Sequence, residues 1–304
     1  MDNTARNGAL YALTAYSLWA VAPIYFKVMQ AVPAIEILAN RVIWSFLLTL
    51  GMVLLMKKRH VLISTLKSSR ARWALLASTL LIGFNWGLFI WAVNANFMLS
   101  ASLGYYINPL INILFGMIFF KDKLGKVRTL AAGLCLIAVL FEVIQFGRLP
   151  WIALMLATSF ALYGLVRKKL GVDSFTGMTL ETGLLLPVAA VYLWFSTSPT
   201  SSHFDNSLTI NLLLFAAGPI TMVPLMCFAA AANRISLTAL GFFQYIAPSG
   251  MFLLAVFVYG ETLTTAKLIT FALIWTALAI LSIDSLNNLR RRKPDPVPLV
   301  TPAK

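Results

Sequence analysis

The chain has 304 residues, of which 60% are hydrophobic and only 11% are charged. A soluble globular domain carries about 25% charged residues, so this composition excludes a water-exposed protein and indicates one that is dissolved in lipid. The net charge of +14 does not indicate a nucleic-acid binder. The basic residues lie in short clusters between apolar runs, whereas nucleic-acid binding needs a continuous basic face.

Ten apolar segments follow one another, each close to the roughly 20 residues that a helix needs to cross a bilayer. The first five are Gly8–Met29, Ile35–Met56, Trp73–Asn94, Ser100–Phe120 and Val127–Phe146. The second five are Pro150–Arg167, Gly177–Ser196, Thr209–Ala232, Leu237–Tyr259 and Thr264–Leu286. The first segment is too long for the apolar part of a cleavable signal peptide. We therefore predict an all-α membrane protein with ten transmembrane helices.

The basic residues predict how these helices are oriented. Of the 24 Lys and Arg residues, 20 fall at the two ends of the chain or in connections that follow an even-numbered segment. Lys and Arg in short loops mark the cytoplasmic side of a membrane. Both termini are therefore predicted to be cytoplasmic, in the inner membrane of a bacterial cell, with residues 287–304 as a basic, Pro-rich tail.

An internal repeat divides the chain into two halves. The string Tyr-Ile-Asn-Pro at 106–109 matches Tyr-Ile-Ala-Pro at 245–248, an offset of 139 residues, and Lys27 aligns with Lys168 at an offset of 141. The halves are residues 1–148 and 149–286, with five segments each. Because five is odd, the second half begins on the opposite side of the membrane. Inverted repeats of this kind are typical of transporters that work by alternating access.

Longer strings then carry a family resemblance. They are AVAPIYFK at 20–27, RVIWS at 41–45, LFIWAVN at 88–94, ASLGYYINP at 101–109 and LGFFQYI at 240–246. With these strings the chain resembles the RarD branch of the EamA-type permeases, in the drug/metabolite transporter superfamily. The resemblance implies ten helices in two inverted repeats, around a central cavity lined mainly by helices one to four and six to nine. It implies transport, without a particular solute.

Two ionisable residues inside the segments are candidates for function, because charges at membrane depth are costly and usually functional. Arg41 lies five residues after Glu36 in the second segment, and Glu181 lies at a similar depth in the seventh. At an offset of 141, Arg41 falls one residue from the position of Glu181. Structural alternatives remain open: Arg41 could snorkel to the periplasmic interface or pair with Glu36, and Glu181 could pair with Arg167 or Lys168 at the interface.

Other polar and aromatic residues are candidates for lining the cavity: Asn85, Tyr106, Asn108, Gln244 and Tyr245. Amide groups in hydrocarbon need either a partner or a wet cavity. The glycines that flank Asn85, at positions 83 and 87, equally favour close helix packing.

The two prolines of the repeat are hinge candidates. Pro109 and Pro248 each remove a backbone hydrogen bond, and the freed carbonyl is tolerated only beside protein, water or solute. A bend that only shapes the bundle is the alternative.

The predicted function follows from a comparison of enzymes, transporters and channels. An enzyme would need a nucleophile and base, paired acids or clustered metal ligands, and the sequence has none of these; no metal or other cofactor is expected. We predict a secondary transporter that moves a drug-like or metabolite solute, with a lipid-linked flipping protein or a channel as alternatives. Its partners are the solute, the bilayer and, if transport is coupled, a proton that Glu181 would carry.

Overall fold

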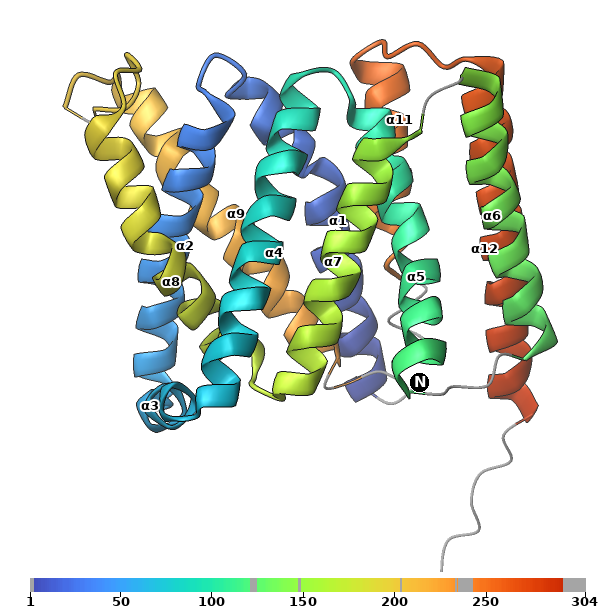
Figure 1. The fold of residues 1–304 in the computed structure, drawn as a ribbon, viewed down its shortest axis with the longest axis horizontal. Helices are drawn as coiled ribbons and strands as arrows, with labels where there is room; N and C mark the ends of the chain where they lie inside the picture. The colour runs from blue at the N-terminus through green and yellow to red at the C-terminus, as the bar shows by residue number, and fades with distance from the viewer. Residues whose placement is uncertain are drawn as a thin grey trace, which may run out of the picture.

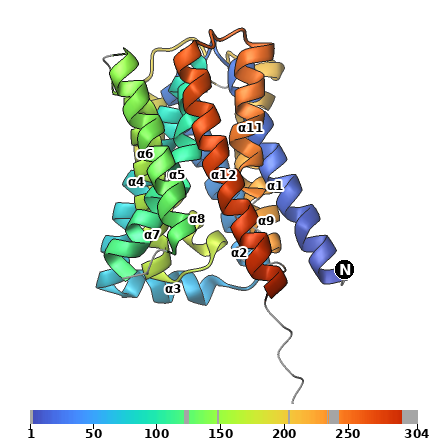
Figure 2. The ribbon, with the colours of Figure 1, turned by 90° about the vertical axis from the view of Figure 1, so that its right-hand side faces the viewer.

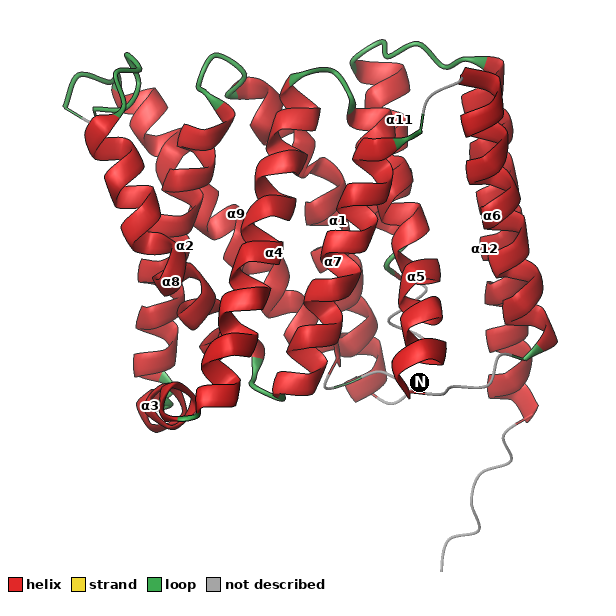
Figure 3. Ribbon diagram, viewed as in Figure 1, coloured by secondary structure: helices red, strands yellow, loops and turns green. Residues whose placement is uncertain are grey.

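The computed structural model describes residues 3–120, 125–146, 149–202, 204–232, 234 and 243–291, and over these ranges it contains helices and no strand (Figure 3). The first part of the chain forms α1 (Asn3–Val28), α2 (Ala34–Leu55), α3 (Arg59–Lys67), α4 (Ser69–Asn94), α5 (Met98–Phe120) and α6 (Lys126–Phe146). The second part forms α7 (Trp151–Leu170), α8 (Ser174–Phe195), α9 (Leu208–Ala232), α11 (Ile246–Leu253), the π-helix η1 (Leu254–Val258) and α12 (Thr265–Arg291).

Every predicted segment corresponds to helix in this structure, although the start of the ninth, residues 237–242, lies outside the described residues. Within the described ranges, five helices are long and apolar enough to cross a membrane: Arg6–Val28, Ala34–Leu55, Ser69–Asn94, Phe175–Phe195 and Leu208–Phe228. Shorter apolar helices include Trp151–Arg167, Ile246–Val258 and Thr265–Ala277. Large apolar side chains such as Trp194, Phe195 and Ile144 are at least 75% exposed, and an outer surface of this kind suits lipid rather than water.

Two local features were not predicted from the sequence. Helix α3 lies across one end of the bundle, where Figure 1 shows it end on, whereas the sequence indicated only a basic loop. The ninth segment is not one regular helix in its described part. Helix α11 begins at Ile246 and passes at Leu254 into a π-helix, a form that is uncommon and is often found at functional sites.

The helices pack mainly between the two parts of the chain. Helix α2 packs on α8 and α9, α4 on α7 and α8, α5 on α7 and α11, and α1 on α9 and α11. Helices α6 and α12 pack on each other and stand at one edge of the bundle (Figures 1 and 2). Neither part therefore encloses a core of its own, and each helix of one part depends on the other.

Glycines allow the closest of these approaches. A Cβ atom at Gly104 on α5 would lie 2.8 Å from the carbonyl oxygen of Ala153 on α7. A Cβ atom at Gly250 on α11 would lie 2.6 Å from the Cβ of Ala20 on α1. Small residues let helix backbones approach closely in membranes, where dispersion contacts rather than the hydrophobic effect drive packing.

We predict that Gly104→Ala separates α5 from α7 and destabilises the protein by about 1–3 kcal/mol, the usual cost of overpacking. The control is Gly164→Ala on α7, where the added methyl group meets no atom within 4 Å and should be neutral or slightly stabilising. Thermal unfolding of both variants in detergent checks this expectation. Equal unfolding temperatures for the two variants would contradict it.

Candidate functional site

Arg41 projects from α2 into an aromatic enclosure. Its guanidinium carbon lies 4.2 Å from the centre of the Trp86 ring on α4 and 5.9 Å from that of Phe26 on α1. Tyr25 and Tyr105 lie near the same guanidinium. A cation over a ring face is attracted by the ring quadrupole, so this cation is held by rings contributed by α1, α4 and α5.

Buried polar side-chain atoms without a hydrogen-bond partner in the described structure are most frequent on α2. On this helix they are both carboxylate oxygens of Glu36, Oδ1 of Asn40, Nε of Arg41, Nε1 of Trp44 and Oγ of Ser45. The Glu36 side chain is fully buried. It cannot complete a capping box, because the residue at the N-cap is Pro33, which has no N–H. Pairing of Arg41 with Glu36, one of the two structural alternatives, is therefore wrong.

Glu181 is in the opposite situation, since its carboxylate has three partners. It accepts hydrogen bonds from Ser78 Oγ on α4 at 2.7 Å and from the Tyr163 hydroxyl on α7 at 3.2 Å. Nη1 of Arg167 on α7 lies 3.7 Å from Oε1 of Glu181. The pairing with Arg167 that the sequence left open is thus observed. We call Glu181, Arg167, Ser78 and Tyr163 the latch.

Further contacts extend the latch to the end of the bundle. Arg167 donates from Nη2 to the carbonyl oxygen of Asp173 at 3.2 Å, and Lys58, just before α3, lies 3.4 Å from the Asp173 carboxylate. Partial burial alone would raise the pKa of Asp173, but hydrogen bonds from Thr176 and the charge of Lys58 bring it below its ordinary value. Asp173 is therefore ionised at neutral pH and holds the connection between α2 and α3 against the start of α8.

Arg41 and Glu181 occupy equivalent places on equivalent helices. Helices α2 and α8 both have 22 residues, and an offset of 140 aligns them from end to end. At that offset Arg41 coincides with Glu181, each seven residues after the first residue of its helix. Lys27 likewise coincides with Arg167. The near-equivalence found in the sequence becomes an equivalence once the helix ends are known.

The two amide candidates serve one helix–helix contact. Asn85 donates from Nδ2 to the carbonyl oxygen of Leu156 at 2.9 Å and to Ser159 Oγ at 2.9 Å. Asn108 donates to the carbonyl oxygen of Ala157 at 3.0 Å. Adjacent carbonyl groups of α7 are thus held from α4 and from α5, which fits the packing role that was the alternative for Asn85.

Tyr106 faces the edge of the bundle rather than Arg41. Its hydroxyl lies 2.6 Å from Ser249 Oγ and accepts a hydrogen bond from Trp275 Nε1 on α12 at 2.8 Å. The side chain is fully buried, and its ring packs edge-on against Phe271. It joins α5, α11 and α12.

The structure describes the surroundings of Pro248 in more detail than those of Pro109. Pro248 lies in the first turn of α11, and its carbonyl oxygen accepts a hydrogen bond from Ser102 Oγ at 2.8 Å. At Pro109 the backbone is helical, but its side chain lies outside the described residues. Gln244 and Tyr245 are half-buried in the turn before α11. Their roles in a cavity or a hinge stay predictions.

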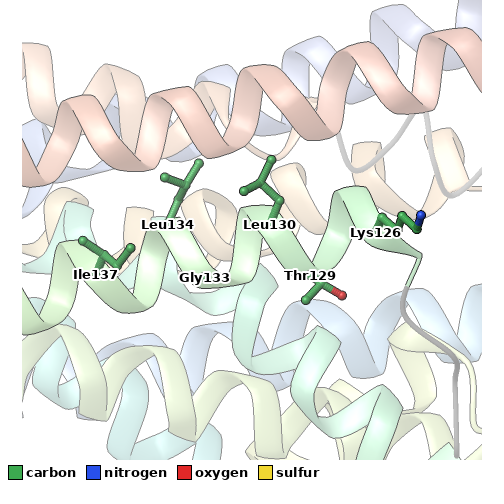
Figure 4. Close-up of a pocket in the computed structure, with 6 residues that line it drawn as sticks. All are labelled: Lys126, Thr129, Leu130, Gly133, Leu134 and Ile137. Carbon is green, nitrogen blue, oxygen red and sulfur yellow. The ribbon is translucent and has the colours of Figure 1, made fainter.

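A groove of about 510 Å³ runs along α6, where it is lined by Lys126, Thr129, Leu130, Gly133, Leu134 and Ile137 (Figure 4). Most of these side chains are apolar, and none belongs to the predicted site. Among the described residues, no group of three or more His, Cys, Asp and Glu side chains could hold a metal ion. The candidate site described above consists of Arg41, its rings and the latch.

Sequence reasoning named Arg167 as a possible partner of Glu181 but missed the other partners of the two charges. Trp86 could have been noticed, because it follows Asn85 directly and an aromatic ring inside a polar motif is a common cation partner. Ser78 and Tyr163 gave no signal, since single hydroxyl groups are frequent in membrane helices. Only the arrangement of α4, α7 and α8 brings them to Glu181.

A bundle with an apolar outer surface and charged groups in its interior defines a polytopic membrane protein. Residues 6–144 match the EamA-like transporter family. An uncharacterised transporter of Vibrio cholerae is 51% identical over 93% of this chain and 94% of its own. The protein RarD of Escherichia coli K12 is 51% identical over 94% of this chain and 97% of its own.

The chain therefore belongs to the RarD-like branch of the EamA-like transporter family, and it is a multi-pass transporter of the bacterial inner membrane. A solved crystal structure with 19% sequence identity superposes with a TM-score of 0.59, over 92% of this chain and 98% of the other. That likeness shows a shared fold.

The latch gives a prediction that depends on Gly177. A Cβ atom at Gly177 would overlap Nη1 of Arg167, so Gly177→Ala should displace the guanidinium from Glu181. We expect Gly177→Ala and Arg167→Met each to lower the free energy of unfolding by up to about 3 kcal/mol, because each leaves a buried carboxylate without its cation.

The double variant distinguishes this cause from a general packing defect. If both changes act through one ion pair, their effects are not additive, and the double variant should be no less stable than Arg167→Met alone. Thermal unfolding in detergent measures all three proteins. Additive losses would show that Gly177 acts independently of the latch.

Proposed function

We propose that the protein is a secondary carrier that moves a small solute across the inner membrane by alternating access. In this proposal ten helices cross the membrane in two inverted halves, residues 1–148 and 149–286. The N-terminus, α3 and the tail from residue 287 lie on the cytoplasmic side. Arg41 faces the solute, and the latch closes the cytoplasmic side.

The observation that carries the proposal is the exchange symmetry of the helix contacts. In the two halves, α1 corresponds to α7, α2 to α8, α4 to α9, α5 to α11 with η1, and α6 to α12. When each helix is replaced by its counterpart, the α4–α7 contact becomes α9–α1. In the same way α5–α7 becomes α11–α1, and α2–α9 becomes α8–α4. The contacts α2–α8, α5–α11 and α6–α12 map onto themselves, and all of these contacts are present.

The direction of the helices supports inversion of the halves. In Figure 1 the N-terminus, α3 and the last turns of α12 lie at the same end of the bundle. Helix α1 starts at that end, whereas its counterpart α7 finishes there, so the two halves run in opposite directions. Two related packings of such halves, one open to each side, are the physical basis of alternating access.

The latch supports a state that is closed at the cytoplasmic end. It joins α4, α7 and α8 through Glu181, and Asp173 and Lys58 extend it to the start of α3. At the equivalent place near the other end, Arg41 has no such partner in the described structure. One end of the bundle is thus fastened by charge, and the equivalent position at the other end is not.

Thiol labelling tests the proposal without knowledge of the solute. Ser45, which is buried and unpartnered one turn beyond Arg41, is replaced by cysteine in a background that lacks Cys135 and Cys227. A membrane-impermeant maleimide is applied to spheroplasts and to inverted vesicles. With the latch intact, we expect faster labelling from the periplasmic side.

The decisive comparison adds Arg167→Met, which removes the cation of the latch. Alternating access predicts a reciprocal change, with faster cytoplasmic labelling and slower periplasmic labelling. A channel predicts faster cytoplasmic labelling with no loss from the periplasm, and that result would overturn the carrier. Lys67→Met, which removes an exposed charge from the same end of the bundle, is the control and should change neither rate.

A further inference from the structure

The Arg41 guanidinium is ionised and forms no ion pair with the described residues. Arginine cannot release its proton in a protein, so its charge must be balanced in place. Within the described part of the chain, the ion pairs join Lys58 to Asp173 and Arg167 to Glu181, and neither includes Arg41. Glu36, the acid nearest in sequence on α2, makes no hydrogen bond through its carboxylate.

The guanidinium also donates no hydrogen bond to the described residues, and its Nε is buried without a partner. The guanidinium carbon lies 4.2 Å from the centre of the Trp86 ring. Attraction of a cation to a ring does not use its N–H groups as hydrogen-bond donors. The N–H edge of arginine is the part that binds a carboxylate through two parallel hydrogen bonds.

The walls around this edge are aromatic. Phe89 packs edge-on against both Phe26 and Tyr105, with ring centres 5.7 Å apart in each case. Tyr25 is fixed by a hydrogen bond from its hydroxyl to the carbonyl oxygen of Leu213 at 2.8 Å. These contacts hold apolar rings, two of them buried in the core, around one fixed charge. Apolar surroundings with few polar groups are typical of small-molecule sites.

We infer that Arg41 and its aromatic enclosure bind the carboxylate of a monoanionic solute whose body is aromatic or otherwise apolar. One cation balances one negative charge, whereas a phosphate dianion would leave a charge unbalanced in a low-dielectric site. This inference names the solute class of the proposed carrier and in that sense rests on the proposed function.

Matched ligand pairs test the charge. The full-length protein is placed in phosphatidylcholine nanodiscs and titrated with benzoate, phenylacetate, 3-phenylpropionate and indole-3-acetate, and with the neutral amide of each acid. Tryptophan fluorescence reports binding, because Trp86 lies beside the charge. We expect at least one acid to bind about tenfold more tightly than its amide, the gain that a charge-assisted bidentate contact provides. If no acid binds more tightly than its amide, the inference is overturned.

Variants then assign the preference to Arg41. Arg41→Lys keeps the charge but loses the planar guanidinium fork, so it should weaken binding of the preferred acid. Arg41→Met should bind the acid and its amide equally. An undiminished preference in Arg41→Met would also overturn the inference.

A stability measurement without ligand gives a second, independent test. If Arg41 is held for a solute, the empty protein contains an unbalanced charge, so Arg41→Met should raise the unfolding temperature by about 2–4 °C. Arg167→Met, which removes a balanced cation, should lower it. A lower unfolding temperature for Arg41→Met would show that Arg41 serves structure alone.

The two proposals can fail separately. Selective binding of an acid does not require alternating access, and reciprocal labelling at position 45 does not require an anion. Reciprocal labelling without a preference for the acid would support the carrier and overturn the anionic solute. A preference for the acid without reciprocal labelling would support the binding site and overturn alternating access.

Discussion

A charge that leaves water must find a partner, and this constraint organises the interior of the protein. Glu181 satisfies it inside the bundle, through Arg167, Ser78 and Tyr163. Arg41 does not, because rings reduce the cost of its burial without balancing its charge. The same rule thus gives one buried charge a set of polar partners and leaves the other with aromatic rings alone.

The two halves share a framework but not the residues that use it. Helices α2 and α8 have the same length, and they place Arg41 and Glu181 at the same turn. The environments differ because the neighbouring helices supply rings on one side and hydroxyl groups with a cation on the other. In the proposed carrier, a symmetric framework provides two packings of similar energy, and the unequal side chains decide which packing is favoured.

The sequence predicted the helices well because lipid imposes a strong rule: each crossing must be a long apolar helix with all its backbone groups bonded. A search for long apolar segments does not predict α3, because that helix is short and amphipathic. It does not predict the π-helix in the ninth segment either, because the composition of that segment is ordinary. The positions of Arg41 and Glu181 followed from the cost of charge in hydrocarbon. Apart from Arg167, their partners did not, since contacts such as Ser78 with Glu181 join residues 103 positions apart. The inward or outward direction of Tyr106 likewise depends on how α12 packs.

The pairing of α6 with α12 also has a consequence for biogenesis. Helix α6 ends at Phe146 and α12 begins at Thr265, so the ribosome must make the whole second half before α6 meets its main partner. At roughly 5–20 residues per second, that interval is on the order of ten seconds. During this time lipid, the translocon or a chaperone must cover the face of α6 that α12 later occupies. Assembly of the bundle therefore finishes at its edge, with the last helix to emerge.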